Sequence, residues 1–294
     1  MATARFVYDH PIASRDRPGA LARWIRWQIG SRLLPGPALV PFVDDAVLLV
    51  EPGMAGATGV VYVGLPEFED MAFVLHFLRP SDLLFDIGAN VGVYSVLAAA
   101  VCGARAMAIE PVPSTFARLS ANLRVNGIEM RVDAKNVGVA SHAGTLTFTS
   151  MDDTVNRVIV AADSAAEATV EVDVTTVDAL AAAVKPALMK IDVEGFESEV
   201  LAGGQTTISS PDVEAIVIEL NGSGSRYGFS DADVDRRLRS SGFAPFRYEP
   251  RSRELRAISD AISTTGNTLY LRDAERALSR VQSAPRRRVL GVEL

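Results

Sequence analysis

The chain has 294 residues, of which 48% are hydrophobic and 22% are charged, so it can bury a large core and is not a disordered protein. Its formal net charge is −7, and its one cysteine, Cys102, excludes a disulfide framework and a cysteine-built zinc site. No stretch is long and apolar enough to cross a bilayer, and no basic segment followed by a hydrophobic one opens the chain, so we expect a cytoplasmic protein without a membrane span.

The charge is distributed unevenly along the chain. Residues 226–294 carry 14 arginines against nine acidic residues, whereas residues 1–225 are acidic. Binding of nucleic acid needs a continuous basic face, so the acidic body argues against a nucleic-acid partner. The arginine cluster 286–288 has two explanations, an anion-binding tail and a general bias of composition towards arginine.

Residues 1–60 are rich in proline and irregular in pattern. Apolar residues recur there at helical spacing and predict one short amphipathic helix: Leu21, Trp24, Ile25, Ile29 and Leu33. Such a stripe ordinarily packs against the rest of the protein, and the alternative is a membrane or partner surface. We expect residues 1–60 to be an N-terminal extension or cap, and residues 273–294 to be a basic C-terminal helix or tail.

From residue 67 onward, predicted helices and strands alternate. The predicted helices cover residues 67–78, 93–101, 114–126, 177–184, 196–202 and 230–239. The predicted strands cover residues 82–85, 106–109, 170–174, 187–191, 213–218, 243–248 and 268–272, and a turn pattern at 141–144 predicts a hairpin within 130–149. Such alternation is typical of an α/β fold with a doubly wound, mostly parallel sheet.

Four acidic residues follow directly after apolar strands: Asp86, Glu110, Asp192 and Glu219. The carboxyl ends of parallel strands meet at one edge of the sheet, where ligands of such folds bind. One acid at a strand end is often only a helix cap, but four at one edge indicate a ligand that is cationic or rich in hydroxyl groups.

A glycine turn follows the first of these strands, with the sequence DIGANVG at residues 86–92. Its glycines are spaced G-x-x-x-G, unlike dinucleotide-binding turns, and Asp86 stands where a pyrophosphate would be repelled. Glu110 lies 22 residues after Gly88, close to the offset of about 20 residues at which an acid binds ribose hydroxyls. S-adenosylmethionine combines a nucleoside, a sulfonium and an ammonium, and it fits these features.

The same segments resemble the FkbM family of S-adenosylmethionine-dependent methyltransferases. The resemblance rests on FDIGANVG (85–92), EPVP (110–113) and KIDVEGFE (190–197), with GLPEFEDM (64–71) and ELNGSG (219–224) beside them. It covers about residues 56–272 and implies a Rossmann-like sheet of the class I methyltransferase type, with an antiparallel strand near the C-terminus. It also implies O-methylation of sugars, polyketides or other secondary metabolites by a domain spanning residues 61–272.

Carried over residue by residue, the resemblance assigns a cofactor site. The glycine turn would line the methionine half of the cofactor through Asp86, Gly88, Asn90 and Gly92. Glu110 would hold the ribose, Asn136 would border the adenine, and Asp192 would lie where the cofactor and acceptor sites meet. The Asn/Asp-Pro-Pro-aromatic signature of base methylation is absent from the strand end at Asp192, which disfavours that reaction.

An aliphatic hydroxyl is a weak acid, so its methylation benefits from a positioned base or a metal. Asp192 and Glu194 are the predicted catalytic residues, as base or as groups that orient the acceptor. For Glu194 the alternative is a favourable position at the start of a helix.

The predicted acceptor-binding residues follow the next strand: Glu219, Asn221, Arg226 and Tyr227. Asp192, Glu219 and Asn221 would also offer three oxygen ligands to Mg²⁺. We do not favour a metal, because the same residues can bind substrate hydroxyls.

Two other functions fit the fold. A nicotinamide-dependent dehydrogenase is disfavoured by the glycine spacing and by Asp86. A non-catalytic nucleoside-binding module would keep the glycine turn but would need neither Asp192 nor Glu194.

Overall fold

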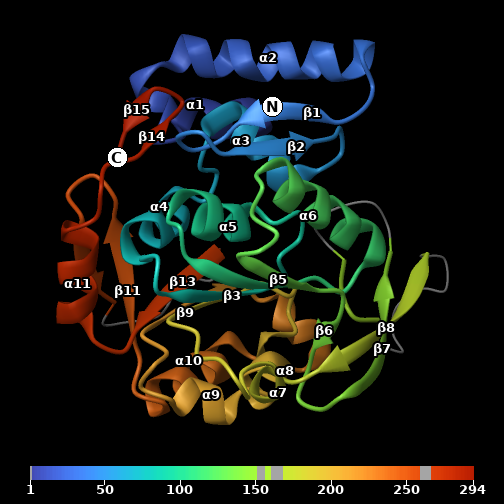
Figure 1. Ribbon diagram of the computed structural model, residues 1–294, viewed down its shortest axis with the longest axis vertical. Helices are drawn as coiled ribbons and strands as arrows, with labels where there is room; N and C mark the ends of the chain where they lie inside the picture. The colour runs from blue at the N-terminus through green and yellow to red at the C-terminus, as the bar shows by residue number, and fades with distance from the viewer. Residues whose placement is uncertain (1, 151–155, 160–167, 259–265) are drawn as a thin grey trace.

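The computed structural model describes residues 2–150, 156–159, 168–258 and 266–294 (Figure 1). Its centre is an eight-stranded sheet in the order β12-β11-β13-β10-β9-β3-β4-β5. Five neighbouring strands run parallel: β5 (Val132–Lys135), β4 (Arg105–Ile109), β3 (Leu83–Ile87), β9 (Leu188–Ile191) and β10 (Ala215–Leu220). The predicted Rossmann-like α/β sheet is therefore confirmed.

The remaining strands of this sheet are antiparallel to their neighbours. β13 (Gly266–Leu271) pairs with β10, β11 (Ala244–Glu249) pairs with β13, and β12 (Glu254–Ala257) pairs with β11. The antiparallel strand predicted near the C-terminus is β13. The strand β12 was not predicted, because its four residues, ELRA, include only one large apolar side chain and are too few to give a clear strand pattern.

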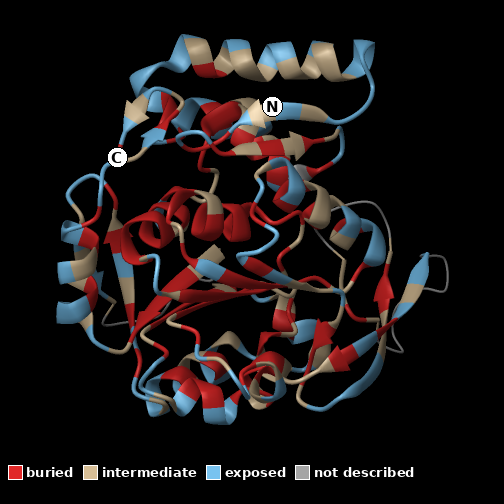
Figure 2. Ribbon diagram, viewed as in Figure 1, coloured by how far each residue is buried: buried red, intermediate tan, exposed pale blue. Residues whose placement is uncertain are grey.

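Both faces of the sheet are covered by helices, as the alternation of side chains across a strand requires (Figure 1, Figure 2). On β3, Leu84 belongs to one buried cluster, while Phe85 and Ile87 belong to another. The first face carries α4 (Phe68–Phe77), α5 (Val93–Val96), α6 (Pro113–Val125) and α11 (Ala274–Gln282). The second carries α7 (Val177–Leu180), α8 (Glu197–Ala202), α9 (Gln205–Ser209) and α10 (Asp231–Ser240).

The hairpin predicted within residues 130–149 is wrong. β6 (Gly138–Val139) and β7 (Gly144–Thr149) do not pair with each other; both pair with β8 (Thr169–Thr175) in a separate three-stranded sheet of order β6-β8-β7. The turn at 141–144 therefore connects two strands that are separated by a third, which a local turn pattern cannot indicate. Most of the polar loop that follows β7 lies outside the described residues.

The first sixty residues are more regular than their sequence suggests. They form α1 (Ala2–Asp9), a 3₁₀ turn (Ala13–Arg15), the predicted helix α2 (Arg17–Leu33), the hairpin β1 (Ala38–Pro41) and β2 (Val47–Val50), and the start of α3 (Ala55–Val63). The strands and α3 were missed because their apolar runs are short and interrupted by proline and glycine.

The C-terminal tail packs against this N-terminal layer (Figure 1). Its hairpin, β14 (Arg288–Val289) and β15 (Val292–Glu293), bridges to the N-terminal layer through Val43 and Val289. Arg287 pairs with Asp44 at 3.1 Å, so at least this member of the arginine cluster is bound within the chain. None of the helices in the described ranges is long and apolar enough to cross a membrane.

The glycine turn after β3 yields a test of the packing at the centre of the fold. Gly88 has φ +79°, and a Cβ atom there would lie 1.8 Å from the carbonyl oxygen of Asp192. Gly127 has φ +62°, but no atom lies within 4 Å of its Cβ position. Gly127→Ala should therefore cost only the left-handed backbone penalty, about 1–2 kcal/mol, whereas Gly88→Ala should cost at least about 2 kcal/mol more through overpacking. Urea unfolding of both variants measures the difference, and equal losses would contradict the close approach of the two loops.

Candidate functional site

A cavity of about 270 Å³ lies at the carboxyl ends of β3, β4, β9 and β10. The four strand-end acids predicted from the sequence all line it, together with other charged residues. The charged lining comprises Glu67, Asp86, Glu110, Lys190, Asp192, Glu194 and Glu219. The topology thus brings together side chains that are up to 152 positions apart in the chain.

Glu110 fixes the two loops on either side of it. It is buried, and its two carboxylate oxygens accept hydrogen bonds from the backbone N–H groups of Asn90 at 3.0 Å and Val112 at 2.9 Å. Asn90 has a positive φ of 51°, a conformation that asparagine tolerates better than most residues. Burial raises the pKa of Glu110 to about 7, in spite of these two hydrogen bonds.

Asp86 is buried at the end of β3, next to the glycine turn. Its carboxylate accepts a hydrogen bond from the Ser95 hydroxyl at 2.6 Å. Burial raises its pKa to about 6, against the opposing effects of Ser95 and of the nearby Lys190. The register of β3 and β9 sets Asp86 directly beside Lys190.

Lys190 is the buried cation of the site, and sequence reasoning assigned it no role. Only 2% of it is exposed, and its Nζ lies 2.8 Å from Asp192 and 5.2 Å from the centre of the Tyr94 ring. Burial alone would lower the pKa of Lys190, but Asp192, Glu67 and Asp86 outweigh burial and raise it. The sequence did contain a signal for this role, a lysine in the middle of an apolar strand, because lysine is almost never buried without a partner.

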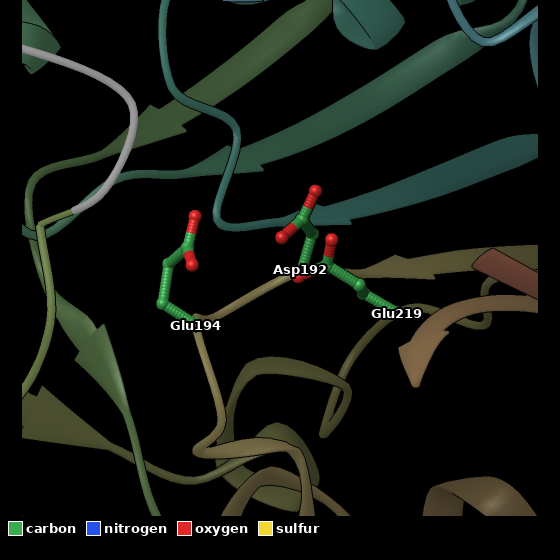
Figure 3. A group of neighbouring side chains, drawn as sticks. All are labelled: Asp192, Glu194 and Glu219. Atoms are coloured by element: carbon green, nitrogen blue, oxygen red, sulfur yellow. The ribbon is translucent and has the colours of Figure 1, made fainter. Parts of the chain in front are cut away.

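Three carboxylates form a group at one side of the cavity. Oxygen atoms of Asp192, Glu194 and Glu219 all lie within 4.8 Å of one another (Figure 3). Burial, and then the neighbouring charges beginning with Asp192, raise the pKa of Glu194 to about 7 and that of Glu219 to about 8. Oε2 of Glu219 is buried and has no hydrogen-bond partner among the described residues. The group can therefore hold a proton or a cation.

The loop that carries Glu194 is held by a second carboxylate. Glu197 is buried at the start of α8, and its Oε1 accepts hydrogen bonds from the N–H groups of Val193 at 3.1 Å and Gly195 at 3.2 Å. Glu194 has φ +55°, and a Cβ atom on Gly195 would lie 2.7 Å from the backbone of Ser223. Glu197 is thus a positioning residue, to which the sequence interpretation assigned no role of its own.

Other predicted site residues lie beside the cavity rather than on its lining. Gly92 faces Leu119, whose Cδ1 would be 2.4 Å from a Cβ on the glycine. The amide of Asn136 donates to the carbonyl oxygens of Glu110 at 2.9 Å and Pro111 at 2.8 Å, so it shapes the segment after β4.

The predicted acceptor-binding residues after β10 lie in an exposed turn. Asn221 is exposed and accepts a hydrogen bond from the N–H of Ser223 at 2.9 Å, and Arg226 is exposed as well. Tyr227 donates to the carbonyl of Val158 at 2.9 Å and packs edge-on against Phe196, whose side chain borders the cavity. Of the three residues considered for Mg²⁺, Asp192 and Glu219 belong to the three-carboxylate group, whose third member is Glu194.

The sequence matches a family described as the methyltransferase FkbM domain over residues 86–245, which is more than half of the chain. The chain belongs to the FkbM methyltransferase family. The matched range contains the glycine turn, Glu110, Lys190 and the three-carboxylate group. The N-terminal layer and the C-terminal tail lie outside it.

Individual proteins that resemble this FkbM-family chain share only a modest part of its sequence. It is 28% identical over 161 residues to the hexuronic acid methyltransferase AglP of Haloferax volcanii, a match that covers 53% of the chain and 62% of that relative. It is 36% identical over 84 residues to the 31-O-demethyl-FK506 methyltransferase FkbM of Streptomyces tacrolimicus, which covers 28% of the chain and 32% of that relative. Among solved structures, precorrin-6y C5,15-methyltransferase of Geobacter metallireducens GS-15 aligns with a TM-score of 0.40 and 12% identity, over 70% of this chain and 87% of that one.

The raised pKa values predict how stability depends on pH. A carboxyl whose pKa is higher in the folded than in the unfolded chain binds its proton more tightly when folded, so its contribution is fully present at low pH and is lost as the pH rises. Five acids of the site behave in this way: Asp86, Glu110, Glu194, Glu197 and Glu219. The free energy of unfolding should therefore fall between about pH 5 and about pH 8.

Chemical denaturation over that pH range, without added ligand, measures this slope. Glu219→Gln removes one of the raised carboxyls and relieves Glu194, so it should make the slope smaller. Glu129→Gln, at an exposed acid on another part of the surface, should leave it unchanged. A free energy of unfolding that rises steadily from pH 5 to pH 8 would show that these acids are not buried together.

Proposed function

We propose that this methyltransferase uses S-adenosylmethionine to methylate a hydroxyl group of a small molecule, such as a sugar, a glycolipid, or a polyketide or peptide secondary metabolite. The observation that carries the proposal is the lining of one cavity by the glycine turn, Glu110 and the three-carboxylate group. In this proposal residues 61–272 are the catalytic domain, residues 1–60 its cap, and residues 273–294 a basic helix and tail. The cytoplasm is the expected compartment, in keeping with a single, buried and unpaired Cys102.

The charges of the cavity fit this cofactor better than a dinucleotide. Asp86 begins the glycine turn, and Glu110 accepts a hydrogen bond from the N–H of Asn90 within it. Near these two carboxylates an ammonium and ribose hydroxyls would be favourable, whereas a pyrophosphate would be repelled. The left-handed glycine at position 88 lets the backbone approach this region closely. Glu219 adds, at the same cavity, a buried carboxylate oxygen that no group in the described part of the chain hydrogen-bonds. The residues present therefore fit a cationic nucleoside.

When bound, S-adenosylmethionine supplies an electrophilic methyl group on a sulfonium. The chain must align the acceptor hydroxyl and take up its proton as the oxygen–carbon bond forms. Glu194 suits the proton because its pKa of about 7 lies near neutral pH, where a general base works best. Asp192, held at 2.8 Å by Lys190, keeps a fixed position and would orient the acceptor. Glu219 would share the proton or bind a second hydroxyl.

The acceptor class is supported by the relatives and by the residues after β10. One relative is named for hexuronic acid and another for 31-O-demethyl-FK506. Both names describe small molecules that bear hydroxyl groups. Asn221, Arg226 and Tyr227 lie on the exposed turn after β10, whose Ser223 contacts the Glu194 loop, so they would meet the outer part of an acceptor. Nucleic acid and metal ions have no assigned part in this reaction.

Calorimetry separates this function from that of a dehydrogenase. S-adenosylhomocysteine should bind and NAD should not. Glu110→Ala should weaken binding by about tenfold or more, because it removes two buried hydrogen bonds and a ribose partner. Glu110→Gln keeps a carbonyl oxygen as acceptor and should lose less. Binding of NAD in preference to S-adenosylhomocysteine would favour the dehydrogenase.

Turnover separates the enzyme from a binding module on the same fold. With a panel of hydroxyl-bearing sugars and polyketides, Glu194→Gln should lower kcat by about 10²–10⁴-fold, as expected for loss of a general base, while S-adenosylhomocysteine binding is retained. Asp192→Asn should also impair turnover, and a chelator should not, because the proton acceptor is a side chain. Undiminished turnover in Glu194→Gln would remove this residue from the mechanism.

A further inference from the structure

The helix α2 forms the outermost layer of the molecule, across the N-terminal layer from the sheet (Figure 1). One side of it packs inward: Ala20 is buried, and Trp24 and Trp27 lie against a cluster that includes Tyr62 and Val63 of α3. Gln28 donates to the Tyr62 hydroxyl at 3.1 Å, which fixes the rotation of the helix about its axis.

The opposite side of α2 exposes a row of large apolar side chains. The row follows the helical spacing i, i+4, i+8 and continues into the next loop, with exposed fractions of 48% for Ile25, 55% for Ile29, 73% for Leu33 and 82% for Leu34. The stripe predicted from the sequence is thus divided: Leu21 and Trp24 pack inward, and the rest is exposed. A contiguous exposed apolar surface of this kind marks a binding site.

The charged side chains of α2 itself are all arginines, and its N-cap residue Asp16 pairs with Arg23 at 3.7 Å. With 3.6 residues per turn, the exposed Arg26 and Arg32 fall on opposite sides of Ile29. Residues 17–43 contain four arginines and no aspartate or glutamate, in a chain whose net charge is −7. An apolar row flanked by arginines is the pattern of a helix that lies in the surface of an anionic membrane.

We propose that α2 and the loop after it dock this protein on an anionic lipid surface. The helix would lie parallel to the bilayer, with Ile25, Ile29 and Leu33 among the acyl chains and Arg26 and Arg32 at the phosphate groups. A second copy of the chain fits less well, because a symmetric pairing of α2 with itself would bring the same arginines together.

The surroundings of α2 agree with a lipid occupant. A groove of about 430 Å³ opens beside the row, lined largely by apolar residues such as Trp27, Val40, Val61 and Leu290. Val61 belongs to α3, and Gly56 of the same helix lines the catalytic cavity. Docking through α2 therefore places the cavity one helix away from the bilayer. The inference does not depend on the identity of the cofactor or acceptor.

Flotation of the whole protein with vesicles tests this proposal. The protein should float with phosphatidylcholine vesicles that contain about one third phosphatidylglycerol, and much less with phosphatidylcholine alone or in about 0.5 M salt. The double variant Ile29→Ser, Leu33→Ser should bind about tenfold more weakly or not at all. The double variant Arg26→Glu, Arg32→Glu should lose binding to a similar extent.

Matched controls separate this face from general charge and hydrophobicity. Met130→Ser removes an apolar side chain outside α2 that is 98% exposed. Arg236→Glu with Arg256→Glu changes the net charge by the same amount as Arg26→Glu with Arg32→Glu, but at a different surface. Both controls should float like the original protein, and thermal unfolding should show that all variants fold. Absence of flotation, equal losses in the controls, or a dimer that Ile29→Ser, Leu33→Ser abolishes without any vesicle binding would each overturn the proposal.

Discussion

The acidic edge of the sheet depends on the buried ammonium group of Lys190. It lies on β9, between β3 and β10, and it faces Asp192 at 2.8 Å while Asp86 is its partner in the strand register. Without this cation, buried carboxylates so close together could remain in place only by taking up protons. With it, one carboxylate of the three-carboxylate group is fixed, while Glu194 and Glu219 keep raised pKa values and stay able to accept a proton or a positive charge.

Two other buried carboxylates, Glu110 and Glu197, position the loops of the site. Glu110 accepts one backbone N–H group from the glycine turn, at the left-handed Asn90, and one from Val112 in its own loop. Glu197 accepts both of its N–H groups, those of Val193 and Gly195, from the loop of the left-handed Glu194. A buried N–H group without a partner is costly, so each carboxylate holds a conformation that the loop would otherwise leave. The backbone strain at the two loops is thus balanced by two acids whose own charge is partly suppressed by burial.

The sequence predicted the strand ends well because each of them combines an apolar run with an acid, two local signals that agree. Lys190 and Glu197 lie in the same segment, but their roles depend on neighbours in space, Asp86 across the sheet and the N–H of Val193 in a folded loop. The hairpin failed for the same reason, since the partner of β7 comes from β8, beyond a long loop. The N-terminal strands are short, and they are stabilised by packing on α6 rather than by their own pattern.

That packing connects the N-terminal layer to the site. Asn122 of α6 accepts a hydrogen bond from the N–H of Leu49 in β2 at 2.7 Å and donates to the carbonyl of Val91, in the glycine turn, at 2.8 Å. Asn122 is fully buried, so neither bond can be replaced by water without cost. A displacement of the N-terminal layer would therefore also displace the turn that borders the cavity. The family match begins only at Asp86, yet the preceding part of the chain supplies Gly56 of α3 and Glu67, directly before α4, to the cavity lining. The segment that precedes the matched family domain is thus built into the lining of the cavity and linked to the glycine turn through Asn122.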